Sequence, residues 1–96
     1  MGIIIEIITS PNCVHSPKAV KLLTDLTKKM KGVIVKEVSV ITPEGQVMAE
    51  EYEIESTPSI AINGRLVFEG LPKKKEMKEM LTDIIEDEKE KLSYFF

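Results

Sequence analysis

The chain begins with a nearly continuous run of β-branched residues, from Ile3 to Ile8, which only Glu6 interrupts. Such a run is typical of a strand that is buried on both faces of a sheet. The segment from Thr9 to Pro11 should end the strand, because proline has no N–H to donate to a strand ladder. We therefore expect a central strand over residues 3–8.

After this strand the apolar positions change to helical spacing from Pro17 onward, with lysines on the opposite side. The apolar positions are Val20, Leu23, Leu26, Thr27 and Met30. Pro17 suits a first helical turn, and Gly32 is a common stop signal. Either Ser16 or Asn12 is a suitable N-cap for this helix.

A second strand is expected over residues 33–40, which are rich in valine. A strand, a helix and a strand in one sheet form a right-handed crossover between two parallel strands. Thr42-Pro43-Glu44 then marks the start of a short second helix, roughly over residues 43–52, because proline and an acidic residue suit a first turn.

The strongest local pattern is a β-hairpin at residues 59–68. Two β-type runs, Ser59 to Ile62 and Arg65 to Phe68, are separated by Asn63-Gly64. Asn-Gly is the pair preferred in type I′ turns, so the two strands should be antiparallel.

The C-terminal part of the chain is expected to form a long amphipathic helix over about 73–91, followed by an aromatic tail at 92–96. The tail contains Tyr94, Phe95 and Phe96, which either fold over the domain or enter a partner. The element order is therefore β-α-β-α-β-β-α, in a single domain over residues 1–96.

Length and composition narrow the class of protein. The chain has 96 residues, of which 43% are hydrophobic and 30% charged, as in one small globular domain. No apolar run approaches the roughly 20 residues of a membrane span, and a cytoplasmic location is expected. The net charge of −3, without a basic stripe, gives no indication of nucleic-acid binding.

The candidate chemistry lies in the turn from Thr9 to Pro17, which contains the only cysteine, Cys13, and the only histidine, His15. One sulfur cannot close a disulfide within the chain or supply a cysteine-based zinc site. A thiol at a helix N-terminus is stabilised as the thiolate by the helix dipole and by unpaired N–H groups. The pKa of Cys13 should then fall below about 8.5, whereas the alternative is a small buried apolar residue.

Two segments carry a family resemblance. They read Thr-Ser-Pro-Asn-Cys-Val-His-Ser-Pro-Lys-Ala at 9–19 and Ser-Thr-Pro-Ser-Ile-Ala-Ile-Asn-Gly-Arg-Leu-Val-Phe-Glu-Gly at 56–70. With the element order, they resemble the thioredoxin-like superfamily, especially small archaeal and bacterial thioredoxin- or glutaredoxin-like proteins.

This resemblance implies an α/β fold, a three-layer α/β/α domain with a four-stranded mixed sheet. It implies a cis peptide bond at Thr57-Pro58, beside the active sulfur. It also implies that Asn12, Val14, Thr57 and Pro58 contact the substrate, with Thr57 holding an extended segment by strand-like hydrogen bonds.

The sequence departs from the family's dithiol motif, Cys-x-x-Cys, because Ser16 occupies the place of the second cysteine. A hydroxyl cannot resolve a mixed disulfide, although it can donate a hydrogen bond to the Cys13 thiolate. His15 as a cation would lower the pKa of Cys13, but the interpretation that we favour is that it faces solvent. The buried acid of thioredoxin is replaced by Ile7. The candidate catalytic residues are therefore Cys13, Ser16 and His15.

The leading functional hypothesis is a thiol-disulfide oxidoreductase that uses Cys13 alone and needs an external thiol to resolve the adduct. Its partners would be a protein or small-molecule disulfide and a reductase or thiol donor. Under this hypothesis the protein needs no cofactor or metal and binds neither nucleic acid nor membrane. It would be a monomer or a weak dimer. The alternatives are a non-catalytic protein-binding module and, less favoured, a monothiol-glutaredoxin-like iron–sulfur carrier, which would need a dimer plus outside thiols.

Overall fold

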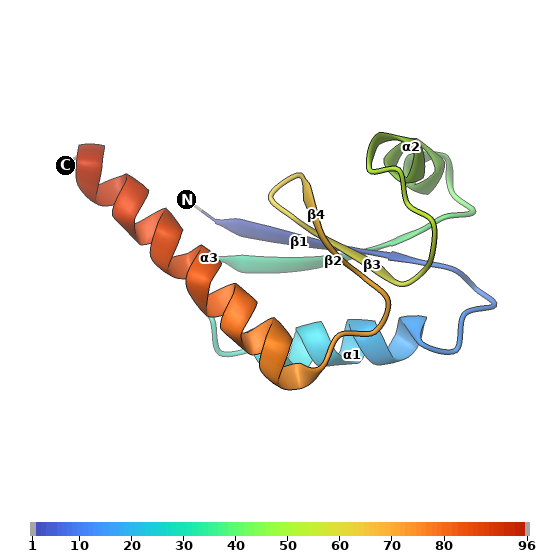
Figure 1. Cartoon of the computed structure of the whole chain (residues 1–96), viewed down its shortest axis with the longest axis horizontal. Helices are drawn as coiled ribbons and strands as arrows, with labels where there is room; N and C mark the ends of the chain where they lie inside the picture. Colours follow the sequence, from blue (N-terminus) through green and yellow to red (C-terminus); the bar gives the residue numbers. More distant parts are fainter. Residues whose placement is uncertain (1, 96) are drawn as a thin grey trace.

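The computed structural model describes residues 2–95, and its side chains as far as Asp87. The sheet consists of β1 (Ile3–Thr9), β2 (Val33–Ser39), β3 (Ser59–Ile62) and β4 (Arg65–Glu69). The helices are α1 (Ser16–Thr27), α2 (Pro43–Glu51) and α3 (Lys74–Phe95). The order β-α-β-α-β-β-α is thus confirmed (Figure 1).

The four strands form one mixed sheet in the order β2-β1-β3-β4. β1 is parallel to β2, as the crossover through α1 requires, and antiparallel to β3. β3 and β4 form the predicted antiparallel hairpin, in which Asn63 and Gly64 have φ angles of 51° and 81°. Positive φ at both turn positions is what a type I′ turn requires. The Asn63 side chain also accepts a hydrogen bond from the Ile4 N–H at 2.8 Å, which joins the turn to β1.

Helices cover both faces of the sheet, so the predicted three layers are present (Figure 1). α1 and α3 lie on one face, where Leu23, Met77 and Leu81 are fully buried against Ile5 and Ile60. α2 covers part of the other face. The smaller core there consists of Ile8, Val38, Met48 and Ala61.

One expectation for the first strand was wrong. The Ile3–Ile8 run is not buried on both faces along its whole length, because the Ile4 side chain is 47% exposed. The short helix α2 reaches Ile8 but leaves the beginning of β1 uncovered. A run of isoleucines indicates a strand, but it does not indicate which of their side chains a helix will cover. That depends on where α2, which is distant in sequence, packs on the sheet.

The N-cap expected for α1 was also wrong. His15 occupies the N-cap position and makes no side-chain cap hydrogen bond, while Ser16 lies inside the first turn. The Ser16 Oγ atom accepts a hydrogen bond from the Ser10 N–H at 3.3 Å, because the turn folds back beneath the helix. α2, in contrast, is capped by the Thr42 side chain, which accepts from the Gly45 N–H at 3.0 Å.

The last helix, α3, extends beyond the expected end near residue 91 and reaches Phe95. No glycine or proline follows Pro72 to stop it. The side chains of the aromatic tail, 92–96, lie outside the described residues. Among the helices that the structure describes, none combines the length and apolar character needed to cross a bilayer.

Candidate active site

The turn that carries Cys13 lies at the end of the sheet where β1, β2 and β4 finish and β3 begins. The Cys13 N–H donates to the Ser10 carbonyl oxygen at 3.1 Å, and the Ser16 N–H donates to the Cys13 carbonyl oxygen at 3.3 Å. These bonds form a compact turn directly before α1. The Cys13 side chain is partly exposed, so its sulfur is positioned at the surface rather than packed in the core.

The sulfur contacts a segment that is distant in sequence. The Cys13 thiol donates to the Thr57 carbonyl oxygen, with a distance of 3.2 Å between sulfur and oxygen. The Thr57-Pro58 peptide bond is cis, and the Pro58 side chain is fully buried. The Gly70 N–H donates to the Pro58 carbonyl oxygen at 2.6 Å, which ties this segment to the end of β4. Two loops are thus held together at Cys13.

The pKa of Cys13 is lowered to about 7, chiefly because the Ser16 hydroxyl donates a hydrogen bond to the sulfur. A hydrogen bond from the Thr57 side chain acts in the same direction, and partial desolvation opposes both. The backbone N–H groups of His15 and Ser16 add smaller stabilisation. The Thr57 carbonyl can accept only from the neutral thiol, so it opposes ionisation, but the donors outweigh it.

Ser16 is the polar side chain that most directly links the turn, the helix and the sulfur. It is only 2% exposed, and its oxygen accepts from the Ser10 N–H while its hydroxyl hydrogen is available to Cys13. A hydroxyl can make both bonds at once. Ser16 therefore positions the turn and stabilises the thiolate, which are separate effects of one side chain.

The other predicted site residues form an exposed rim around the sulfur. Asn12 and His15 are exposed, and the Val14 side chain is 74% exposed. His15 lowers the Cys13 pKa through its backbone N–H, and its imidazole is not among the groups that do so. The structure therefore brings Cys13, Ser16, Thr57 and Pro58 together, while the side chains of the rim residues extend into solvent.

Two surface hollows meet at Ser10, and Cys13 lines one of them while Thr57 lines the other. The first has a volume of about 250 Å³ and is lined by Cys13, Ser16 and Glu37. The second has a volume of about 220 Å³ and is lined by Thr57, Ser56 and Glu55. A substrate that reaches the sulfur therefore has space beside Cys13 and beside its contact residue Thr57.

Glu37 is a site residue that the sequence reasoning missed. Its carboxylate accepts a hydrogen bond from the Thr9 hydroxyl at 2.9 Å. Thr9 is buried at the end of β1, where its partner on β2 is Ser39. Glu37 is two residues before Ser39, so its side chain lies on the same face of β2. The signal was present, because parallel neighbouring strands bring their carboxyl ends to the same edge of the sheet.

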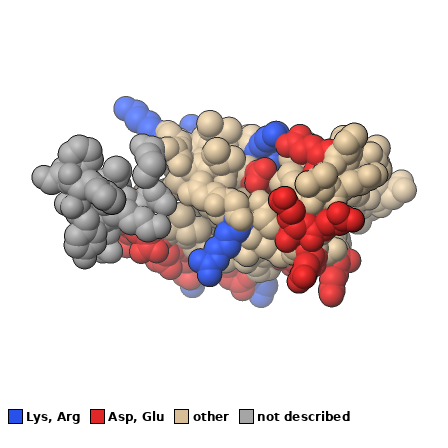
Figure 2. All heavy atoms as spheres, turned by 90° about the horizontal axis from the view of Figure 1, so that it is seen from above, with Lys and Arg blue, Asp and Glu red and all other residues tan. Residues whose placement is uncertain are grey.

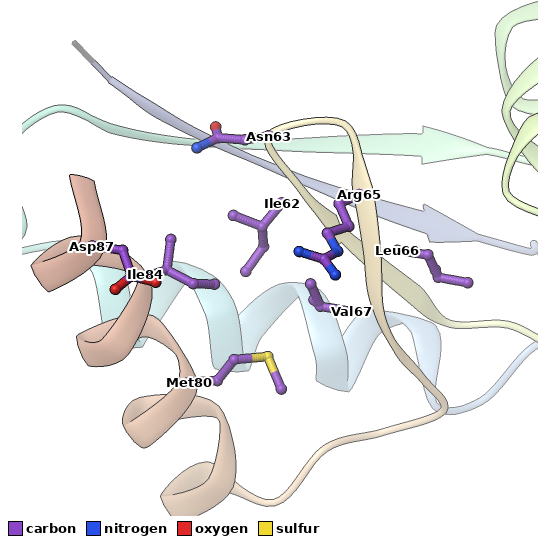
Figure 3. A pocket seen from close by; sticks show the side chains of 8 residues that line it. All are labelled: Ile62, Asn63, Arg65, Leu66, Val67, Met80, Ile84 and Asp87. Carbon is purple, nitrogen blue, oxygen red and sulfur yellow. The ribbon is translucent and has the colours of Figure 1, made fainter. Parts of the chain in front are cut away.

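A larger hollow, of about 530 Å³, lies between α3 and the β3–β4 hairpin (Figure 3). Arg65, Met80 and Asp87 are among its lining side chains. It shares no lining residue with the two hollows at the sulfur, and it contains no thiol or imidazole. Over the part of the chain that the structure describes, no group of three or more His, Cys, Asp or Glu side chains gathers to hold a metal ion.

Comparison with known proteins gives a consistent result. The family described as "Thioredoxin domain" matches residues 3–82. A protein of Methanocaldococcus jannaschii described as "Thioredoxin" is 35% identical over 78 residues, which cover 80% of this chain and 89% of that protein. A "Probable Thioredoxin" of Methanothermobacter thermautotrophicus is 32% identical over 87 residues, covering 90% of this chain and all of that protein.

The fold also matches a solved structure, a variant thioredoxin from Halobacterium salinarum. The TM-score is 0.65 at 17% sequence identity, over 81% of this chain and 70% of the other. At this level of identity the likeness concerns the fold.

Proposed function

Because this chain belongs to the thioredoxin family, we propose that it carries out thiol-disulfide exchange through Cys13 alone. The observation that supports this proposal is the sulfur itself, which is accessible, has a pKa of about 7 and belongs to a residue that lines an open hollow. A thiol with this pKa is roughly half ionised at neutral pH, and the thiolate is the species that attacks a disulfide.

The exchange begins when the Cys13 thiolate attacks one sulfur of a substrate disulfide. The substrate S–S bond breaks, the other substrate sulfur leaves as a thiolate, and a mixed disulfide with Cys13 forms. An external thiolate then attacks the Cys13 sulfur and frees the rest of the substrate. A second external thiolate releases Cys13. In total, one substrate disulfide is reduced and two external thiols are oxidised to a disulfide.

The surrounding residues have distinct roles in this proposal. Ser16 stabilises the thiolate both as attacking and as leaving group. Thr57 flanks the sulfur and binds the substrate backbone, and the buried Pro58 positions Thr57 beside the sulfur. Asn12 and Val14 contact the substrate from the rim. Two further apolar side chains, Ile41 and Leu71, are 67% and 39% exposed and follow β2 and β4 at the same end of the sheet. Exposed apolar side chains at the end of the sheet that carries the sulfur favour a protein substrate over a small disulfide. A cytoplasmic location stays a prediction.

The proposal is tested by intact-mass measurement of the protein after addition of a peptide whose single cysteine is disulfide-bonded to 2-mercaptoethanol. We expect one adduct per chain, removed by glutathione, and no adduct with Cys13→Ser. If the wild type forms no adduct, yet wild type and Cys13→Ser capture the same partner equally well, the protein is instead a non-catalytic binding module. Ser16 in place of a resolving cysteine is the feature that favours that second function.

A further inference from the structure

The space around the sulfur carries charge of one sign. Of the residues that line the two hollows, the charged ones are Glu37 and Glu55, one in each hollow. Both side chains are exposed. Among the described residues, no lysine, arginine or histidine lines either hollow. Even His15, which is on the same turn as the sulfur, lies outside both.

One carboxylate is held by its side chain and the other by its backbone. The Glu37 carboxylate accepts the hydrogen bond from the buried Thr9 hydroxyl at 2.9 Å. The Glu55 backbone N–H donates to the Glu69 side chain at 3.2 Å, which ties the loop before Thr57 to the end of β4 and places a third carboxylate beside Glu55. Each hollow therefore presents an acidic group to a substrate that binds at Cys13.

The acidic character extends beyond the hollows. Acidic side chains gather at the end of the molecule that carries α2 (Figure 2). The exposed members on α2 and the following loop are Glu44, Glu50, Glu51, Glu53 and Glu55. Of these, Glu44 is paired with Lys36 at 2.6 Å. A surface of one sign beside a reactive group accelerates the approach of oppositely charged partners and slows that of like-charged ones.

The groups that shift the pKa of the thiol are those of Ser16, Thr57 and His15, and Glu37 and Glu55 are not among them. Replacing Glu37 and Glu55 should therefore leave the pKa of the thiol close to that of the wild type.

We infer that Glu37 and Glu55 make this site selective for protein disulfides whose cysteine is flanked by lysine or arginine, and that they disfavour acidic disulfides. This inference rests on the proposed exchange reaction at Cys13. One carboxylate in each of the two hollows that meet at Ser10 suits an extended segment with cations on both sides of its cysteine.

The test uses three peptides that differ only in the residues flanking one cysteine, which are lysine, glutamine or glutamate. Each cysteine is disulfide-bonded to 2-mercaptoethanol, and the rate of adduct formation on Cys13 is followed by intact mass. At about 0.01 M salt the Debye length is about 30 Å, so charges near the site still act on the peptide. We therefore expect the lysine peptide to react at least about tenfold faster than the glutamate peptide. The ratio should fall toward one at about 1 M salt.

The matched variants separate local charge from overall charge. Glu37→Gln/Glu55→Gln should bring the lysine-to-glutamate rate ratio at low salt to within about threefold. Glutamine can still accept the Thr9 hydrogen bond, so the turn is retained. Glu79→Gln/Glu86→Gln changes the net charge equally on exposed positions of α3, and should leave the ratio as in the wild type.

The outcomes distinguish the selectivity from the exchange reaction. If the glutamine peptide reacts but the wild-type ratio is near one, or if both double variants lower the ratio equally, the selectivity is overturned and the exchange reaction stands. If no peptide reacts with Cys13, the exchange reaction fails and the selectivity falls with it.

Discussion

Cys13 owes its low pKa to donors from two parts of the chain that meet only in the folded protein. Ser16 is three residues away and its hydroxyl is the strongest of them, whereas Thr57 is 44 residues away. Position at a helix N-terminus indicated the direction of the pKa shift from the sequence alone. The contribution of Thr57 depends on tertiary packing, which no local pattern contains.

The importance of Ser16 can be measured at the sulfur. Ser16→Ala removes the largest stabilisation of the thiolate, so the pKa of Cys13 should rise from about 7 toward the ordinary range of a thiol. In the wild type the lowered pKa of Cys13 keeps the thiolate present above about pH 7, and the thiolate is lost below that pH. Because Ser16→Ala raises this pKa, less thiolate is present at neutral pH, and the variant should react roughly fivefold more slowly with iodoacetamide. The pH dependence of alkylation provides the measurement. Thr24→Ala, which removes an exposed hydroxyl from the same helix, is the control, and an unshifted midpoint in Ser16→Ala would show that the hydroxyl is not the cause.

Among the elements, α2 shows how closely a helix must approach the sheet in order to cover it. Gly45 lies in the first turn and is buried against the end of β2. A Cβ atom at this position would lie 1.9 Å from the Ser39 carbonyl oxygen, a backbone atom that cannot move aside like a flexible side chain. Alanine is the better helix former, yet here it has no space.

Gly45→Ala is therefore expected to destabilise the fold, against helix propensity. We expect the free energy of unfolding to fall by about 2 kcal/mol or more, because either α2 or the end of β2 must shift. Urea denaturation followed by circular dichroism measures this change. Gln46→Ala, at the next and exposed position, should change stability by less than about 0.5 kcal/mol. Equal or higher stability of Gly45→Ala would contradict the close approach.

Local signals explain which elements could be predicted. Asn63-Gly64 and Thr42-Pro43-Glu44 specify a turn and a helix start by their own chemistry, and both were placed correctly. Ser16 was expected as a cap, but the turn uses it for Ser10 and Cys13 instead. Ile4 was expected to be buried because its neighbours in sequence are apolar. It is exposed because α2 is short and does not cover the beginning of β1.

At the scale of the whole molecule, the three layers bring one end of the sheet, the Cys13 turn and the Thr57-Pro58 segment to a common surface. The fold could be predicted because strand order follows from the crossover and the hairpin. The pair of hollows could not, since Glu55 comes from a loop distant from Glu37 in sequence and only folding brings the two hollows together at Ser10. This arrangement offers one thiol to a substrate. Under the mechanism that we propose, release of the substrate therefore requires an external thiol.

The most direct test of this single-thiol mechanism is the rate at which a peptide is released from its isolated mixed disulfide with Cys13, measured against external thiol concentration. For the wild type we expect essentially no release without external thiol and a rate that rises in proportion to its concentration. Ser16→Cys, which supplies a second sulfur at the position whose side chain now hydrogen-bonds to the Cys13 sulfur, should release the peptide without any external thiol. Release from the wild type at a comparable rate in the absence of external thiol would contradict the mechanism.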